Sequence, residues 1–191
     1  MTATGPISKN PVLSTDDAFL AEPVHEETPR HKAYRYAFAV TRISLGWIFL
    51  WAFLDKMFGL GNETAEKAAW INGGHPTEGF LKFAATGPFK GIYNDIAGAA
   101  WADWLFMLGL LGIGLALILG IALRIAATTG ATLLVLMWTA VLPPENNPFM
   151  DDHLIYAAVL VLLALVGAGS TLGFGKAWAN LPIVRDNSWL K

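Results

Sequence analysis

Apolar residues along the chain gather into four long runs that are separated by polar segments. The runs cover about residues 36–60, 104–123, 125–142 and 153–173. A helix needs about 20 predominantly apolar residues to cross the core of a bilayer, and each run is close to that length. None of the runs alternates between apolar and polar residues, which argues against a membrane β-barrel. Because backbone groups in lipid must find hydrogen bonds within the chain, the pattern predicts a bundle of four transmembrane helices.

The basic residues predict how these helices are oriented. Most of them lie before the first run, between the second and third runs, or after the fourth run. These are Lys9, Arg30, Lys32, Arg35, Arg124, Lys176, Arg185 and Lys191. The long segment between the first two runs holds only Lys67, Lys82 and Lys90, and the segment between the last two holds none. Since basic residues concentrate on the cytoplasmic side, we expect a multi-pass protein of the cell membrane with both termini in the cytoplasm.

The polar segments divide the chain further. Residues 1–33 are rich in prolines and acids, and no apolar core follows a basic start, so they predict a cytoplasmic N-terminal tail rather than a cleaved signal peptide. Such a tail is disordered in isolation unless a neighbouring protein holds it. We expect a membrane domain over residues 34–178 and a cytoplasmic C-terminal tail over residues 179–191.

The segment of about residues 61–102 is the largest element that we expect outside the membrane, on the outer face. Two stretches in it, "ETAEKAAWI" at 63–71 and "PTEGFLKFAA" at 76–85, have the composition of short helices. The apolar residues Trp70, Phe80, Leu81 and Phe83 suggest that these helices lie on the membrane surface.

Small residues on the second run predict helix packing. Gly112, Ala116 and Gly120 are spaced by four, and Gly109 extends the same side of the helix. Small residues at this spacing let another helix approach closely. We therefore expect this face to be a seam between two helices, with no ligand implied.

Composition supports the membrane assignment and excludes several kinds of function. Hydrophobic residues make up 54% of the chain and charged residues 15%, against about 25% charged in average globular domains. A net charge of −2 offers no general attraction to nucleic acid. With no cysteine, no paired histidines deep in an apolar run and no dinucleotide fingerprint after a strand, we expect no iron–sulfur cluster, haem or flavin.

Ionisable residues cluster where the first run ends and the fourth begins. His153 is three residues and Asp152 four residues before Tyr156, so these side chains can share a face of one helix. If the two helices are neighbours, this face meets Lys56 and can bind an anion, or hydrogen-bond a quinone carbonyl and exchange its protons. The candidate catalytic residues are therefore His153, Lys56 and Tyr156. The candidate ligand-binding residues are Asp55, Asp152, Arg42 and Trp51.

Plainer roles remain open for the same residues. Asp55 and Lys56 can simply anchor the outer end of the first helix, and Asp151 or Asp152 can cap the fourth. For Arg42 we favour an interaction of its guanidinium with lipid headgroups. Asp151, Asp152 and His153 are consecutive and point apart on a helix, so we predict no metal site.

The chain resembles the DoxX family of small four-helix membrane proteins. The residues that carry the resemblance are "TRISLGWIFLWAFLDKMFG" at 41–59, "WADWLFMLGLLGIGLALILGIALRIAATTGA" at 101–131, "NNPFMDDHLIYAAVLVLLAL" at 146–165 and "GAGSTLGFGKAW" at 167–178. Within the family it is most similar to the DoxD-like large subunit of thiosulfate:quinone oxidoreductase. The resemblance implies a quinone-linked redox role at the outer face, together with a second, mostly extracytoplasmic subunit.

Two functions follow as expectations. The first is a membrane subunit of a quinone-linked redox system, with menaquinone or ubiquinone bound non-covalently and other redox subunits as partners. The alternative is a non-catalytic structural or accessory subunit of a larger respiratory membrane complex. A transporter is a weaker interpretation, because no inverted repeat or pair of broken helices is evident.

Overall fold

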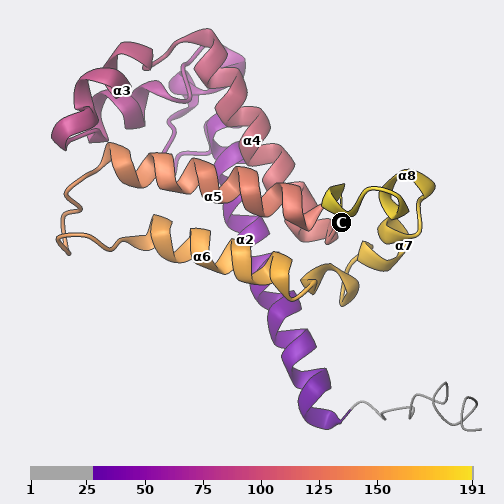
Figure 1. Ribbon diagram of the computed structural model, residues 1–191. Helices are drawn as coiled ribbons and strands as arrows, with labels where there is room; N and C mark the ends of the chain where they lie inside the picture. Colours follow the sequence, from indigo (N-terminus) through magenta and orange to yellow (C-terminus); the bar gives the residue numbers. More distant parts are fainter. Residues whose placement is uncertain (1–27, 191) are drawn as a thin grey trace, which may run out of the picture.

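The computed structural model describes residues 28–190, and this part of the chain is entirely helical, without strands (Figure 1). Three of its helices are long and apolar enough to cross a membrane: α2 (Pro29–Phe58), α4 (Ala100–Leu119) and α5 (Leu123–Ala140). A fourth apolar helix, α6 (Asp152–Leu165), is shorter. Most of the predicted N-terminal tail, residues 1–27, lies outside the described residues, as does residue 191.

Capping residues set the ends of α2, and the hydropathy pattern does not reveal them. Thr28 caps the helix by accepting the His31 N–H, and Pro29 occupies the first helical position. Gly59 ends the helix in the left-handed conformation, with a φ of 63°. The helix therefore begins at Pro29 rather than near residue 36, and its first turns are polar.

The fourth apolar run is not one continuous helix, so the predicted helix over 153–173 was wrong at its end. The helix stops at Leu165, and Gly167 follows with a φ of 62°. A 3₁₀ turn, η5 (Ala168–Ser170), comes next, and Leu172 also has a positive φ of 50°. The glycine-rich sequence permits these left-handed positions, which an α-helix cannot accommodate.

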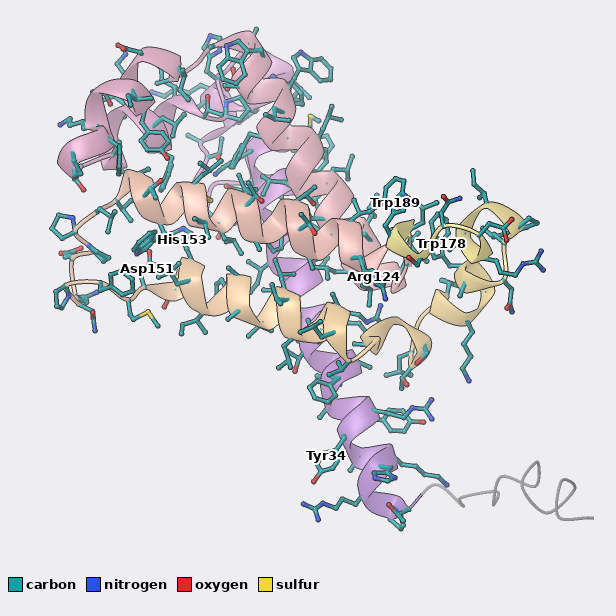
Figure 2. The ribbon with its side chains drawn as sticks, viewed as in Figure 1. Tyr34, Arg124, Asp151, His153, Trp178 and Trp189 are labelled. Carbon is teal, nitrogen blue, oxygen red and sulfur yellow. The ribbon has the colours of Figure 1, made fainter. Side chains whose placement is uncertain are left out.

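The segment after this bend folds against the first turn of α5. It contains α7 (Gly175–Ala179), α8 (Pro182–Arg185) and a final turn, η6 (Ser188–Leu190). Arg124 at the start of α5 donates to the Ser188 carbonyl at 2.8 Å, and the Trp178 indole donates to the Leu190 carbonyl at 2.7 Å. Figure 2 shows Arg124 beside Trp178 and Trp189. The predicted C-terminal tail is thus packed on the helices.

The helices form two closely packed pairs, α2 with α4 and α5 with α6 (Figure 1). Glycines make both contacts close. A Cβ at Gly46 would lie 2.8 Å from the Leu117 side chain, and one at Gly114 the same distance from the Leu50 nitrogen. In the second pair, a Cβ at Gly130 would lie 2.7 Å from Leu160. These glycines, rather than the predicted seam, allow the helices to approach.

Arg42 has a structural position in the first pair, where α2 passes the C-terminal end of α4. Its side chain is fully buried and donates to the carbonyls of Leu117 at 2.6 Å and of Leu172 at 2.8 Å. The last carbonyls of a helix lack partners within the helix, and Arg42 supplies donors for them. The expected interaction of this guanidinium with lipid headgroups was therefore wrong. The arginine instead ties the end of α4 to the bend after α6.

The long segment between α2 and α4, which we call the outer segment after its predicted side of the membrane, consists of short turns and one short helix. The first predicted helix is present as two 3₁₀ turns, η1 (Glu66–Ala68) and η2 (Trp70–Asn72). The second is a π turn, η3 (Gly79–Ala84). A 3₁₀ turn, η4 (Gly87–Phe89), and α3 (Lys90–Ile96) complete the segment. Figure 1 shows this segment at the end of the molecule where α4 begins and α5 ends.

Candidate functional site

The two helix pairs leave a large cavity between α4 and α5, with a volume of about 1100 Å³. These helices are joined by a tight turn, in which Gly120 has a φ of 72° and Ala122 a φ of 48°. From this turn they diverge, since α4 is held by α2 and α5 by α6 (Figure 1). The cavity fills the space where they separate.

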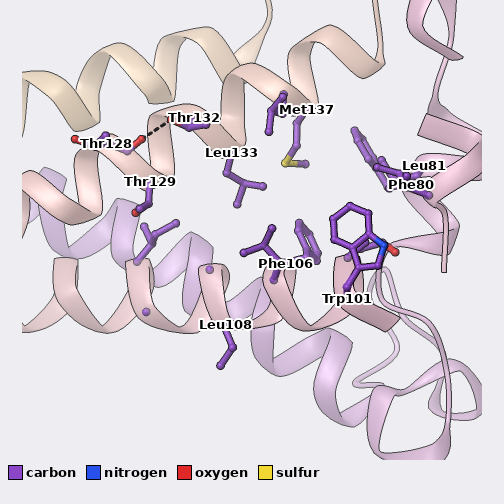
Figure 3. A pocket seen from close by; sticks show the side chains of 18 of the residues that line it. Phe80, Leu81, Trp101, Phe106, Leu108, Thr128, Thr129, Thr132, Leu133 and Met137 are labelled. Carbon is purple, nitrogen blue, oxygen red and sulfur yellow. Dashed lines mark hydrogen bonds between the residues drawn. The ribbon is translucent and has the colours of Figure 1, made fainter. Parts of the chain in front are cut away.

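Carbon atoms form almost all of the cavity wall (Figure 3). From α4 it is lined by Trp101, Leu105, Phe106, Gly109 and Gly112. From α5 it is lined by Ile125, Thr129, Leu133, Leu136 and Met137. A Cβ at Gly109 or Gly112 would meet no atom within 4 Å. Gly109 and Gly112 of the predicted seam therefore face the cavity and not another helix of the described chain. Gly120, at the end of the seam, is in close contact, since a Cβ there would lie 2.8 Å from the Gly169 carbonyl oxygen.

Leucines at the rim of the cavity face outward. Leu105 is 68% exposed, Leu108 57% and Leu136 50%, although each also lines the cavity. These residues lie on helices long and apolar enough to cross a membrane. If α4 and α5 do cross it, the rim is in contact with lipid, and a ligand can enter from the bilayer.

The outer segment covers the outer end of the cavity. It is fastened to α5 by the Thr86 N–H, which donates to the Ala140 carbonyl at 2.8 Å, and by the Tyr93 hydroxyl, which donates to the Leu136 carbonyl at 3.0 Å. Phe80 and Leu81 line the cavity, and Figure 3 shows them opposite Trp101 at one end of it. Only Phe83, which is 77% exposed, projects as the predicted surface position requires.

The same segment is also fastened to α2 and α4 by buried carboxylates. Asp55, which is 2% exposed, accepts the N–H groups of Asn62, Glu63 and Thr64 at 3.3, 3.1 and 2.9 Å. On α4, Asp103 likewise accepts a backbone N–H of the segment, that of Thr77. These contacts fix the outer segment over the open end of the helices.

Asp103 is the centre of a hydrogen-bonded cluster at the outer mouth of the cavity. Its Oδ1 accepts the Thr77 N–H at 3.0 Å and the Thr77 hydroxyl at 2.6 Å. Its Oδ2 lies 2.9 Å from Nδ1 of His75. The Thr77 hydroxyl in turn accepts the Gly98 N–H at 3.1 Å. The Asp103 side chain is 3% exposed and that of His75 is 52% exposed, so the cluster runs from the surface to a buried acid.

One further ion pair lies beside this cluster. Lys82 donates to Oε1 of Glu78 at 2.9 Å. This hydrogen bond and the charge of Lys82 hold the pKa of Glu78 below its usual value, and the charges of His75 and Asp103 act on it in opposite directions. Within residues 28–190, no group of three or more histidines and carboxylates is arranged to hold a metal ion.

Threonines provide the polar groups on the α5 wall. The hydroxyls of Thr128, Thr129 and Thr132 each donate, at 2.8 Å, to the carbonyl four residues earlier. Figure 3 shows the Thr128–Thr132 bond and places these threonines at the opposite end of the cavity from Phe80 and Trp101. A hydroxyl that has donated its proton can still accept a hydrogen bond. The cavity therefore has acceptors at one end and the Asp103 cluster at the other.

The residues predicted from the sequence lie in separate local settings. Lys56 pairs with Glu63 at 3.2 Å. His153 pairs with Asp151 at 2.7 Å, and Asp151 also caps α6 by accepting the Leu154 N–H. Figure 2 shows both residues at the start of α6. Among the described residues, no hydrogen bond or ion pair joins Lys56 to His153 or to Tyr156.

The other candidates have structural or peripheral positions. Tyr156 packs against the hydrophobic core, and Asp152 is exposed. Trp51 is 38% exposed and lies 5.9 Å from Trp47 between ring centroids, on an outward face of α2. Asp55 and Arg42 hold the chain together as described above. His153 does approach the cavity wall, since its ring centroid is 6.4 Å from that of Phe80.

Sequence reasoning missed the Asp103 cluster. No sequence pattern singled out Asp103 or His75, and Thr77 was noted only as part of the predicted short helix over residues 76–85. The partners are 28 and 26 residues from Asp103, so no local spacing reveals them. The available signal was a carboxylate in the first turn of an apolar helix, which is costly to bury without partners.

No family model, curated protein or solved structure matches the chain. The resemblance to the DoxX family therefore stays a prediction, and the function has to be argued from the cavity and the residues around it.

Proposed function

We propose that the chain is a membrane subunit of a quinone-linked redox system and that its α4–α5 cavity binds an isoprenoid quinone. The observation that carries the proposal is the cavity itself. Its volume of about 1100 Å³ slightly exceeds the usual range of small-molecule pockets, about 300–1,000 Å³. Its wall is almost wholly carbon, its polar groups are confined to the two ends, and its rim leucines face outward.

A quinone has the chemical shape that such a cavity accepts. Its isoprenoid tail is apolar and matches the carbon wall, and its two carbonyls need only a few hydrogen-bond donors. At the outer end, the hydroxyls of Thr77, Tyr93 and Thr139 reach the cavity wall. They already donate to Asp103 or to the Leu136 carbonyl, so a quinone carbonyl bound there takes a hydrogen bond when one of these hydroxyls turns toward it. An aromatic ring also stacks favourably on residues such as Trp101, Phe80 and Phe106. We therefore place the headgroup at the outer end and the tail along α4 and α5.

The proposal includes the membrane topology. We propose that α6 and the turns after it complete a fourth crossing and that both termini are cytoplasmic. The contact of Arg124 with Ser188 supports this arrangement, as does that of Arg35 with the Thr171 hydroxyl at 3.0 Å, because both bring predicted inner segments together. The outer segment, fixed on the opposite ends of α2, α4 and α5, is then the surface on which an extracytoplasmic redox subunit docks.

A cavity-filling variant tests the binding proposal. In Gly112→Leu the new side chain occupies the cavity, and the helix accepts it because a Cβ there meets nothing within 4 Å. We expect the affinity for decylubiquinone, measured by quenching of tryptophan fluorescence in detergent micelles, to fall at least about tenfold, or 1.4 kcal/mol. Gly91→Leu is the matched control, since Gly91 is helical, has equally open surroundings and does not line the cavity.

Two outcomes would contradict the proposal. If the wild-type chain does not bind decylubiquinone or a menaquinone analogue, the cavity is not a quinone site. If Gly112→Leu and Gly91→Leu bind equally well, the quinone binds elsewhere. The redox role is tested separately, by reduction of the quinone with thiosulfate in membranes that contain the native partners. An absence of turnover there contradicts catalysis but not binding.

A second candidate function, a non-catalytic accessory subunit of a respiratory complex, is favoured by one observation. Gly109 and Gly112 present a small-residue face with open space before it, where a helix of another subunit can approach closely. In that case a larger membrane protein co-purifies in mild detergent, and Gly112→Leu abolishes the association. A chain that migrates alone and binds quinone contradicts this function.

A further inference from the structure

The cluster at the outer mouth of the cavity forms a continuous hydrogen-bonded chain between the outer surface and the cavity wall. His75 is half exposed, and its Nδ1 contacts Oδ2 of the buried Asp103. Oδ1 of Asp103 holds the hydroxyl of Thr77, which lines the cavity. Trp101 and Ala102, which directly precede Asp103 on α4, line it as well. Three groups that can each give and take a proton thus stand in sequence, with contacts of 2.9 and 2.6 Å.

The charges around the cluster leave this chain free to carry protons. Within the described residues, Asp103 has no lysine or arginine partner, and its contacts are those with His75 and Thr77. Glu78, which lies within electrostatic range of both His75 and Asp103, is itself paired with Lys82. Among its contacts within the described residues, the carboxylate of Asp103 therefore has no permanent cation, and the imidazole of His75 is the ionisable group that it touches.

We propose that His75, Asp103 and Thr77 form a relay that carries protons between the outer aqueous surface and the headgroup of a ligand in the cavity. This inference rests on the proposed quinone site and adds to it the side of the membrane from which protons come. It assigns the cavity to chemistry in which an oxygen of the ligand gains or loses a proton, as a quinone carbonyl does when it becomes a hydroxyl.

The proton count of the relay balances. When a reductant supplies two electrons, the quinone becomes a quinol and takes up two protons. For each proton, the Thr77 hydroxyl turns from Oδ1 of Asp103 to a quinone oxygen, gives its hydrogen to that oxygen and regains one from the protonated Asp103 carboxyl. Asp103 takes a proton from His75, and His75 regains one from water at its exposed edge. One proton leaves the outer water for each proton that the quinone gains, and the three residues return to their starting state.

A purely structural role for Asp103 makes a different prediction. In Asp103→Asn the amide oxygen can still accept both Thr77 hydrogens and so hold the outer segment on α4. The amide cannot accept and release protons as a carboxyl does. Likewise, in His75→Gln the side-chain amide can keep a hydrogen bond to Asp103 but does not titrate. Both variants therefore retain the fold while interrupting the relay.

The test uses the full chain in nanodiscs loaded with decylubiquinone, with sodium dithionite as the two-electron reductant. Quinone binding is measured first, by tryptophan quenching. The rate of quinol formation is then followed by stopped-flow absorbance from pH 5 to pH 8, the range in which imidazoles titrate. We expect the wild-type rate to change across this range. In His75→Gln and Asp103→Asn we expect it to fall at least about tenfold and to lose that dependence, while affinity changes less than about twofold.

Matched variants separate the relay from a change in packing. His153→Gln removes the other histidine of a histidine–carboxylate pair and should keep the wild-type rate and pH profile. Thr77→Ser keeps the hydroxyl and should retain the rate, whereas Thr77→Val should lose it. If Asp103→Asn does not fold, His75→Gln tests the relay instead. This variant should fold, because the His75 side chain is half exposed.

The outcomes distinguish the two proposals. Normal binding with unchanged rates and pH profiles in His75→Gln and Thr77→Val overturns the relay and leaves the quinone site standing. A wild-type chain that binds no quinone overturns the quinone site, and the relay with it. Equal slowing in His153→Gln and His75→Gln also overturns the relay, because the effect is then not specific to the cluster at the cavity mouth.

Discussion

Two histidine–carboxylate pairs lie at the end of the molecule that carries the outer segment. They share their chemistry but differ in sequence separation, burial and partners. Asp151 and His153 are two residues apart, and Asp103 and His75 are 28 apart, at contact distances of 2.7 and 2.9 Å. The Asp151 side chain is 15% exposed and that of Asp103 is 3% exposed. The first pair organises one helix end, whereas the second joins two distant segments at the mouth of a cavity.

Burial and the number of distant partners, rather than residue type, distinguish a helix cap from a candidate site. Asp151 accepts the Leu154 N–H and orients a neighbouring ring, as capping residues generally do. Asp103 satisfies two donors of Thr77 in addition to His75, and Thr77 lines the cavity. A buried carboxylate is expensive unless such partners are in place. Removing Asp103 should therefore lower the free energy of unfolding by a different amount from removing Asp151.

The largest expected effect comes from Asp103→Ala. This change leaves the Thr77 N–H and hydroxyl without their acceptor in a buried position, and each unsatisfied buried donor costs about 1–3 kcal/mol. We expect a loss of about 2–4 kcal/mol in the free energy of unfolding, measured by thermal denaturation in detergent with tryptophan fluorescence. Asp95→Ala, an exposed acid of the same outer segment, is the control and should be nearly neutral. Equal stabilities of the two variants would show that the Asp103 contacts contribute little.

A smaller effect is expected when the local pair is broken. Asp151→Ala removes the N-cap of α6 and should cost about 1 kcal/mol. Asp151→Ser restores a capping oxygen and should recover most of this loss, although it cannot hold His153 in the same way. Asp152→Ala, at an exposed position beside the cap, should change stability least of the three. If Asp151→Ala lowered the free energy of unfolding as much as Asp103→Ala does, the two pairs would not differ in their contribution to stability.

The apolar pattern predicted the membrane helices because hydropathy is a property of the local sequence. The second and third runs were placed within a few residues of α4 and α5. The observed helix ends differ from the predicted ones because a helix end depends on single residues. Examples are Gly59 after α2 and Gly120 after α4, which both have left-handed conformations. The fourth run was overextended because its glycines read as apolar although they bend the backbone.

The contents of the candidate site could not be predicted in the same way. Helical spacing correctly grouped Gly109 with Gly112, but the sequence does not say whether such a face meets a helix or a cavity. That depends on α4 packing on α2 through Gly114, which leaves the opposite face open. Arg42 was misjudged for a related reason, because its acceptors lie 75 and 130 residues away in the sequence.

The smallest expected effect concerns the charges beside the Asp103 cluster. Lys82 lowers the pKa of Glu78, so this pair stabilises the fold at pH values where Glu78 is ionised, above its ordinary pKa of about 4.5. The contribution disappears as the pH falls through the lowered pKa. We therefore expect Lys82→Met to reduce the melting temperature slightly at pH 7 and to match the wild type at pH 3, whereas Lys90→Met, on the same outer segment, shows no such convergence. A difference that persists at pH 3 would mean that Lys82 acts through its packing on Phe83 rather than through Glu78, because its ammonium lies 5.9 Å from that ring. In that case the Lys82–Glu78 ion pair contributes little to stability, and the charge of Glu78 counts mainly through its electrostatic effect on the proposed His75–Asp103 relay.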